Sequence, residues 1–305
     1  MVIPASQNVH LRSRLDNSRI RFSQSRQGKV AFIGGSITEM NGYRPMVCEF
    51  LSKRFPNTEF TFTDAGIAST CSTTGAFRLS DDVLAADPDL LFVEFAVNDD
   101  QDAAHAAREC RRGMEGILRQ ALKHNPTMDI VVTHFVNPPM LERLRSGQTP
   151  VSSGQHEAVA THYGIATVDL AREVASRIEA GRLTWQIYGG THPGPAGNRL
   201  AADMIGDLLD TAWSEPLGSS AQPQPHRLPK PLDENSYDSG RWVDIRDAQF
   251  DSNWRVHVPD WSQLAGQCRS RFQDTHVLSA TTPAAELSLE FAGTAVGAYL
   301  LAGPD

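Results

Sequence analysis

The sequence predicts an α/β protein of three layers, α/β/α, in which helices cover both faces of a mostly parallel, five-stranded sheet. Short apolar runs alternate with helix-length segments through the first 213 residues, and strands separated by helices imply crossover connections and a parallel sheet. Three of the runs lead directly into motifs that contain Gly, Ser or Asn. After residue 231 the pattern changes from helical to strand-like, which predicts a small C-terminal β-rich module.

The expected strands are apolar runs at regular intervals. They cover residues 29–33, 59–63, 90–96, 129–136 and 165–170. The third run, LLFVEFA, is nearly all apolar, as a central strand of a parallel sheet should be. Helices are expected between and after the strands, at residues 43–55, 103–124, 154–163 and 195–213.

Composition divides the chain into four segments. We expect an N-terminal extension at 1–28, the α/β domain at 29–213, a linker at 214–231 and the β-rich module at 232–305. The linker holds five prolines in eighteen residues, which favours an extended backbone. Within the module, strands are expected at 241–245, 254–258, 286–291 and 295–301. The sequence stops directly after the last of these, so we expect the module to be incomplete here or to lean on the main domain.

Charge and hydropathy exclude some classes of partner. The formal net charge is -8, the pI is about 5.7 and the chain has no basic tract, so nucleic acid is not an expected partner. No run of about 18 apolar residues predicts membrane insertion. The first residues lack the apolar core of a signal peptide, which predicts a cytoplasmic protein, or a secreted one if a leader was removed. The four cysteines lie far apart in the sequence and are expected to be free thiols.

Three motifs follow predicted strands and place Ser36, Gly66 and Asn98 at one edge of the sheet. The carboxyl edge of a parallel sheet is where open α/β proteins bind their ligands. Each of the three residues also has a non-catalytic interpretation. A Gly-Gly-Ser turn can bind phosphate or simply reverse the chain, Gly66 can belong to an ordinary turn, and Asn98 can cap a local turn. A nucleotide site lacks its required partners, since neither a Walker lysine nor G-x-G-x-x-G is present.

His192 lies in the run GGTHPG, just before the last predicted helix of the domain. A histidine on such a loop is often merely exposed. Together with the other three residues, however, it completes a set of nucleophile, backbone donor, amide donor and general base. Acyl transfer requires this set.

In this ordered set the chain resembles the SGNH hydrolases, the superfamily of GDSL-type esterases, over roughly residues 29–213. Ser36, Gly66, Asn98 and His192 match the four residues that name the superfamily. The resemblance implies a flavodoxin-like sheet and a serine esterase that forms an acyl-enzyme on Ser36, with His192 as general base. It also implies an oxyanion hole formed by the backbone N–H groups of Ser36 and Gly66 and the side chain of Asn98, with no cofactor and no metal.

The chain departs from the family pattern at Gly35 and Gly189. The family usually has aspartate at both positions, and the second is the acid that orients the catalytic histidine. A wrong histidine tautomer can cost about 10⁴ in rate, so a substitute is required. We expect a backbone carbonyl within residues 185–190 to accept from His192 Nδ1, with Asp169 as the alternative. The predicted site is therefore a Ser–His dyad.

The substrate is less constrained by the sequence. A mean hydropathy of -0.33 and the lack of a long apolar lid favour a short acyl group on a polar carrier, and the accessory β module resembles that of carbohydrate esterases. A small-molecule or oligosaccharide ester is thus the expected substrate. Residues flanking the motifs are either sugar-contacting walls or ordinary packing groups: Tyr43, Arg44, Trp185 and Tyr188.

Three alternatives stay open at this point. A thioesterase or lysophospholipase would use the same residues. A non-catalytic carbohydrate-binding protein on a degenerate hydrolase scaffold would explain the missing acid. A metal phosphoesterase would instead use Asp99, Asp100 and His134, although His134 in the fourth predicted strand is also typical of a core or cleft-wall residue.

Overall fold

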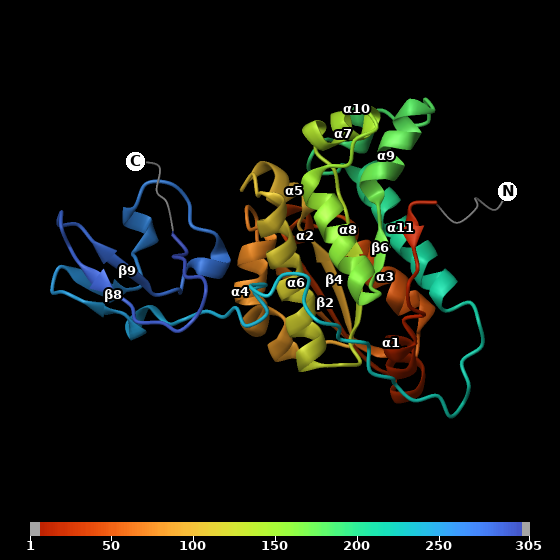
Figure 1. Cartoon of the computed structure of the whole chain (residues 1–305), viewed down its shortest axis with the longest axis horizontal. Helices are drawn as coiled ribbons and strands as arrows, with labels where there is room; N and C mark the ends of the chain where they lie inside the picture. Colours follow the sequence, from red (N-terminus) through yellow and green to blue (C-terminus); the bar gives the residue numbers. More distant parts are fainter. Residues whose placement is uncertain (1–6, 301–305) are drawn as a thin grey trace. The chain divides into compact units, whose positions relative to one another are not determined.

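A computed structural model describes residues 7–300 of the chain, which divides into two compact units, Met1–Arg241 and Trp242–Asp305. The first unit has a central, mostly parallel sheet with helices on both faces, as predicted (Figure 1). The predicted fold class is confirmed.

The central sheet has six strands in the order β1-β6-β5-β4-β2-β3. The strands are β1 (Val9–His10), β2 (Gln27–Gly34), β3 (Glu59–Gly66), β4 (Leu90–Glu94), β5 (Asp129–Thr133) and β6 (Ala166–Val168). All neighbours pair in parallel except β1, which runs antiparallel to β6. The sequence predicted five strands; β1 was missed because two residues are too few to show a period. It lies in the segment that was expected to be an extension.

The longer helices form the two outer layers. One face of the sheet packs against α4 (Ser72–Asp82), α6 (Ala107–His124) and α8 (Val151–Tyr163), and the other against α3 (Tyr43–Arg54), α9 (Leu170–Glu179) and α11 (Pro195–Ala212). Along β2, Ala31 and Ile33 enter the first core and Val30 and Phe32 the second, because successive strand side chains point to opposite faces.

Shorter helices connect these elements. They are α1 (Asp16–Ile20), the π-helix Arg21–Ser25, α2 (Ser36–Glu39), the 3-10 helix Leu84–Ala86, α5 (Ala96–Gln101), α7 (Pro138–Arg145) and α10 (Trp185–Tyr188). Among the helices within residues 7–300, none is both long enough and apolar enough to cross a bilayer.

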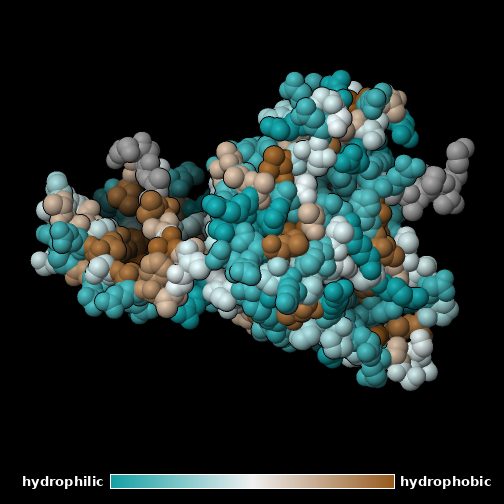
Figure 2. Space-filling view, viewed as in Figure 1, coloured by the Kyte–Doolittle hydropathy of each residue, from teal (hydrophilic) through white to brown (hydrophobic). Residues whose placement is uncertain are grey.

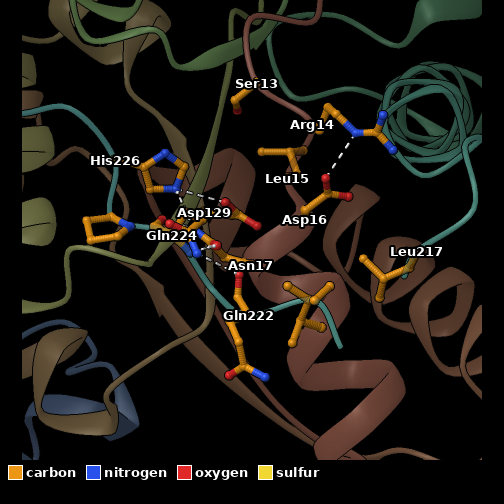
Figure 3. A pocket seen from close by; sticks show the side chains of 13 residues that line it. Ser13, Arg14, Leu15, Asp16, Asn17, Asp129, Leu217, Gln222, Gln224 and His226 are labelled. Carbon is orange, nitrogen blue, oxygen red and sulfur yellow. Dashed lines mark hydrogen bonds and ion pairs between the residues drawn. The ribbon is translucent and has the colours of Figure 1, made fainter. Parts of the chain in front are cut away.

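The proline-rich segment 214–231 lies against the first unit. His226 Nε2 is 2.9 Å from Asp129 Oδ1, and the backbone N–H of Gln224 donates to Asn17 Oδ1 at 2.7 Å (Figure 3). A cavity of about 420 Å³ opens beside these contacts, and none of the four predicted site residues lines it. Because Asp129 begins β5, the segment crosses the amino end of the sheet, which is the edge opposite Ser36.

The second unit contains two small antiparallel sheets. One pairs β7 (Gln249–Phe250) with β10 (Leu287–Ser288), and the other pairs β8 (Trp254–His257) with β9 (Val277–Ala280). The strand predicted at 241–245 is absent, and a 3-10 helix begins at Ile245. Residues 295–300 of the last predicted strand pair with no other strand, and residue 301 lies outside the described residues. Two further 3-10 helices cover Trp261–Gln263 and Ser270–Phe272.

Apolar side chains are gathered on the surface of this second unit, as the brown atoms of Figure 2 show. Val296, Tyr299 and Leu300 are 58%, 53% and 81% exposed. Within the described residues, every buried apolar side chain except that of Pro259 belongs to the first unit. Short paired strands therefore give this unit little core of its own.

Candidate active site

Ser36 and His192 meet at the carboxyl edge of the sheet. Ser36 is the first residue of α2, directly after the turn that follows β2, and His192 lies in the loop between α10 and α11. Ser36 Oγ and His192 Nε2 are 2.8 Å apart, although 156 positions separate them in the sequence. Ser36 is half-buried and His192 is exposed, so the hydroxyl and the imidazole form a hydrogen-bonded pair that solvent can reach.

Asn98 lies beside the same turn. It belongs to α5, which follows β4, and it is 2% exposed. A Cβ added to Gly35 would come within 2.1 Å of Asn98 Oδ1 and 2.6 Å of Asn98 Cγ, so the amide occupies the space that an aspartate at position 35 would need. Asn98 Nδ2 donates to Asp102 Oδ2 at 2.6 Å. A primary amide has two N–H groups, which leaves one for a ligand.

Gly66 ends β3 and pairs in register with Gly34 of β2. A Cβ on Gly66 would come within 2.3 Å of the backbone nitrogen of Glu39, which explains why glycine is required there. Its N–H donates to Asp64 Oδ1 at 3.0 Å, so an oxyanion would have to compete with this carboxylate oxygen for the N–H group. Asp64 is itself held by Arg44 at 2.8 Å.

The loop that carries His192 has no room for the acid usual in the family. Gly189 has a φ of 106°, and a Cβ on it would come within 2.0 Å of the backbone nitrogen of Gly194. Within residues 7–300, His192 Nδ1 has no hydrogen-bond partner, so the carbonyl expected from residues 185–190 is not in place. Asp169 is engaged elsewhere, because it caps α9 by accepting from the backbone N–H of Arg172.

Glu94, the last residue of β4, also lies at this edge of the sheet, although its position there was not predicted from the sequence. Its side chain is fully buried, and its Oε1 accepts from the backbone N–H of Gly35 at 2.9 Å and from Thr38 Oγ1 at 2.8 Å. Burial raises the pKa of Glu94 to about 7, against hydrogen bonds that lower it. The available signal was a single acidic residue inside an otherwise apolar run.

Asp99 lies in a separate buried network behind the site. It accepts hydrogen bonds from the backbone N–H and hydroxyl of Ser72 and lies 2.9 Å from His156 Nε2. Burial alone would raise the pKa of Asp99, but the nearby imidazoles of His105 and His156 and the hydrogen bond from Ser72 outweigh it and hold that pKa well below its usual range. These contacts tie α4 and α8 to α5 and fit a structural role.

The three residues of the metal-phosphoesterase alternative do not share a site. Asp100 accepts from Asn137, whereas His134 contacts Glu157 at 3.1 Å. In the described part of the chain, the group with metal-ligand spacing is Asp99, His105 and Cys110, whose ligand atoms lie within 4.8 Å of one another. Only Asp99 is common to the two sets.

Two of the flanking aromatics are packing groups. Tyr43 and Tyr188 are 1% and 0% exposed, so they cannot form a sugar-contacting wall. Trp185 packs on Tyr188, with ring centroids 5.2 Å apart, and Arg44 pairs with Asp64.

A three-layer fold with a serine hydroxyl and an imidazole paired at the carboxyl edge of its sheet is the architecture of an SGNH-type hydrolase. Residues 32–200 match the model of the GDSL-like Lipase/Acylhydrolase family. The chain belongs to this family and is an ester-bond hydrolase, as the resemblance implied.

Solved structures share the fold. A two-domain esterase (CEX) active on acetylated mannans, co-crystallised with mannopentaose, is similar over 95% of this chain and 75% of its own, with 24% sequence identity and a TM-score of 0.70. A putative GDSL-like lipase from Parabacteroides merdae is similar over 60% of this chain and 95% of its own, with 17% identity and a TM-score of 0.52. No curated protein matches this chain in sequence.

Proposed function

We propose that the protein is a serine esterase that removes short acyl groups, acetyl in particular, from a carbohydrate. The observation that carries the proposal is the 2.8 Å contact between Ser36 Oγ and His192 Nε2 at the carboxyl edge of the sheet. The fold likeness to an esterase active on acetylated mannans supports the choice of carrier, because it extends over 95% of this chain.

The first half of the reaction forms an acyl-enzyme. His192 Nε2 takes the hydroxyl proton of Ser36 while Oγ attacks the ester carbonyl. The tetrahedral intermediate then collapses, the bond to the sugar oxygen breaks, and His192 returns the proton to that oxygen. In the second half, His192 takes a proton from water, the resulting hydroxide attacks the acyl carbonyl, and the proton returns to Ser36 as acetate leaves.

The oxyanion of each intermediate is stabilised by hydrogen-bond donors around Ser36. Within the described residues, the Ser36 backbone N–H makes no other hydrogen bond. Asn98 has one N–H beyond the one bound to Asp102, and the Gly66 N–H contributes when the oxyanion displaces Asp64 Oδ1. Such donors act on charge that develops in the transition state, so they raise kcat.

His192 acts without a carboxylate partner in this mechanism. Its ring is exposed, so water solvates the imidazolium that forms when the serine proton is taken up. The contact with Ser36 Oγ selects Nε2 as the acceptor, and with it the tautomer that carries its proton on Nδ1.

Charged groups around the donors favour a polar carrier. Arg44 contacts both the carbonyl of Thr38 and the carboxylate of Asp64, and Asp102 holds Asn98. A sugar hydroxyl can exchange hydrogen bonds with such groups, whereas a long alkyl chain would desolvate them without compensation.

The test is acetate release from acetylated manno-oligosaccharides, compared with p-nitrophenyl esters of increasing chain length, acyl thioesters and lysophospholipids. We expect turnover of the acetylated sugar and of short esters, and its loss in Ser36→Ala. Preference for the thioester or the lysophospholipid would assign the same site to the alternative substrates. Failure of a fluorophosphonate probe to label the wild-type serine would indicate a non-catalytic scaffold.

A further inference from the structure

Glu94 is a fully buried carboxyl group at the end of the central strand β4. It pairs in register with Gly34, the last residue of β2, so its side chain lies directly under the turn that carries Ser36. A Cβ added to Gly34 would come within 2.3 Å of Glu94 Oε1, which shows how closely the carboxyl group fits against that turn.

The hydrogen bonds of Glu94 lie on both sides of Ser36. One oxygen, Oε1, accepts from the backbone N–H of Gly35, one residue before the serine, and from Oγ1 of Thr38, two residues after it. Thr38 Oγ1 is also 3.0 Å from the hydroxyl of Tyr43 on α3. The backbone at Ser36 is therefore held from the sheet and from a neighbouring helix.

The placement of Glu94 has an energetic cost. Within residues 7–300, no cation is paired with this carboxyl group, and its Oε2 has no hydrogen-bond partner. The hydroxyl of Tyr188, on the element just before the His192 loop, is also buried and unpartnered. Packed apolar side chains are often as stabilising as a buried charged group, so stability alone does not explain a carboxylic acid at this position.

We propose that Glu94 is a positioning residue for Ser36: its carboxyl group holds the backbone on both sides of the nucleophile and keeps Oγ aligned with His192. The inference rests on the proposed function, because it assumes that Ser36 is the nucleophile. A displacement of about 1 Å of a reacting group can cost about 10²-fold in rate, so a small relaxation of this turn would be measurable.

Glu115 provides a matched control. It is also fully buried, and it accepts from the backbone N–H groups of Leu232 and Asp233 and from the hydroxyl of Tyr163. These partners anchor the segment after residue 231 and the end of α8 to α6, and they do not include any residue of the Ser36 turn. Loss of Glu115 should therefore lower stability without changing the reactivity of Ser36.

The experiment compares Glu94→Ala, Glu94→Gln, Thr38→Val and Glu115→Ala in the full chain. It measures kcat and KM for p-nitrophenyl acetate, the second-order rate of fluorophosphonate labelling, and Tm. We expect Glu94→Ala to lower kcat and the labelling rate by about 10²-fold with little change in KM. Glu94→Gln should restore most of both rates, because its Oε1 keeps the two acceptor bonds. Thr38→Val should give a smaller decrease, and Glu115→Ala should lower Tm alone.

Several results would overturn the inference while leaving the proposed function intact. The first is a Glu94→Ala variant that folds and is labelled at the wild-type rate. The second is a Glu94→Gln variant whose labelling rate and kcat are no higher than those of Glu94→Ala, and the third is a Glu115→Ala variant whose labelling rate is as low as that of Glu94→Ala. If Glu94→Ala does not fold, an unchanged labelling rate in Thr38→Val overturns it instead. A wild-type protein that neither hydrolyses the ester nor takes up the probe would overturn the proposed function, and this inference with it.

Discussion

Gly189 and Gly194 approach each other through their backbones: a Cβ built on Gly189 would lie 2.0 Å from the nitrogen and 2.5 Å from the Cα of Gly194. Gly189 also has a φ of 106°, in the left-handed region that disfavours residues with a side chain. The two glycines close the loop that carries His192. This loop geometry leaves no room at position 189 for the carboxylate usual in the family, and in the proposed mechanism His192 acts without it.

Gly189→Asp should therefore lower activity instead of restoring a triad. The strained backbone costs on the order of 1–3 kcal/mol, and the clash with Gly194 must shift the loop and with it His192. Kinetics on p-nitrophenyl acetate and thermal unfolding would both register the change. Gly190→Asp is the matched control, because Gly190 has a φ of 98° but nothing lies within 4 Å of its added Cβ. A Gly189→Asp variant with a higher kcat than wild type would contradict the dyad.

The rate of hydrolysis should fall as the solution is made acidic. In the proposed mechanism His192 Nε2 takes the proton of Ser36 and must be unprotonated to do so, so its protonation would remove the general base. A profile of kcat/KM against pH measures this, and His192→Ala should show low residual activity without the acidic decline. A wild-type profile without a decline toward acid would argue against His192 as the base.

Asn98→Ala should reduce kcat by about 10²–10³-fold and change KM little, since the role proposed for its amide is to stabilise the developing oxyanion. Asn137→Ala is a suitable control. Asn137 is also a fully buried amide, but it caps α7 and binds Asp100, so its loss should affect stability alone. If the Asn98 variant instead raises KM at constant kcat, the residue binds the ground state of the substrate.

The sheet was largely predictable from the sequence because burial on both faces leaves nearly continuous apolar runs, of which β4 is the clearest. The edge strand β1 was not predictable, nor were β7 and β9 of the second unit, because two to four residues carry no detectable period. By contrast, β8 and β10 fall within the strands expected at 254–258 and 286–291. The proline-rich segment shows the same limit. Composition predicts an extended backbone there, whereas its docking depends on two specific partners, Asn17 and Asp129.

The meeting of Ser36 with Asn98 and His192 was predictable because parallel strands bring their carboxyl ends to one edge. The individual contacts within this site could not be predicted from the sequence. The bond between Gly66 N–H and Asp64 depends on a local turn, the clash at Gly189 depends on a loop φ angle, and the position of Glu94 depends on strand register. Each is a geometric property that residue type alone does not specify.

The buried carboxyl group of Glu94 should make folding stability depend on pH in a defined direction. Burial raises its pKa from 4.5 to about 7 in the folded protein, so below pH 4.5 it is protonated in both the folded and unfolded states. Between these values the unfolded chain releases its proton first, and stability falls as pH rises. Above pH 7 the full cost is present, on the order of 3 kcal/mol.

Glu94→Gln removes this dependence, because an amide does not ionise while its oxygen still accepts from Gly35 and Thr38. The difference in Tm between Glu94→Gln and wild type should therefore be small near pH 4.5 and grow in favour of the variant up to about pH 7. Taking the difference cancels the other titrating groups that the two proteins share. A difference that stays constant with pH, or that grows toward acid, would show that Glu94 is ionised in the folded protein and that its hydrogen bonds compensate for burial.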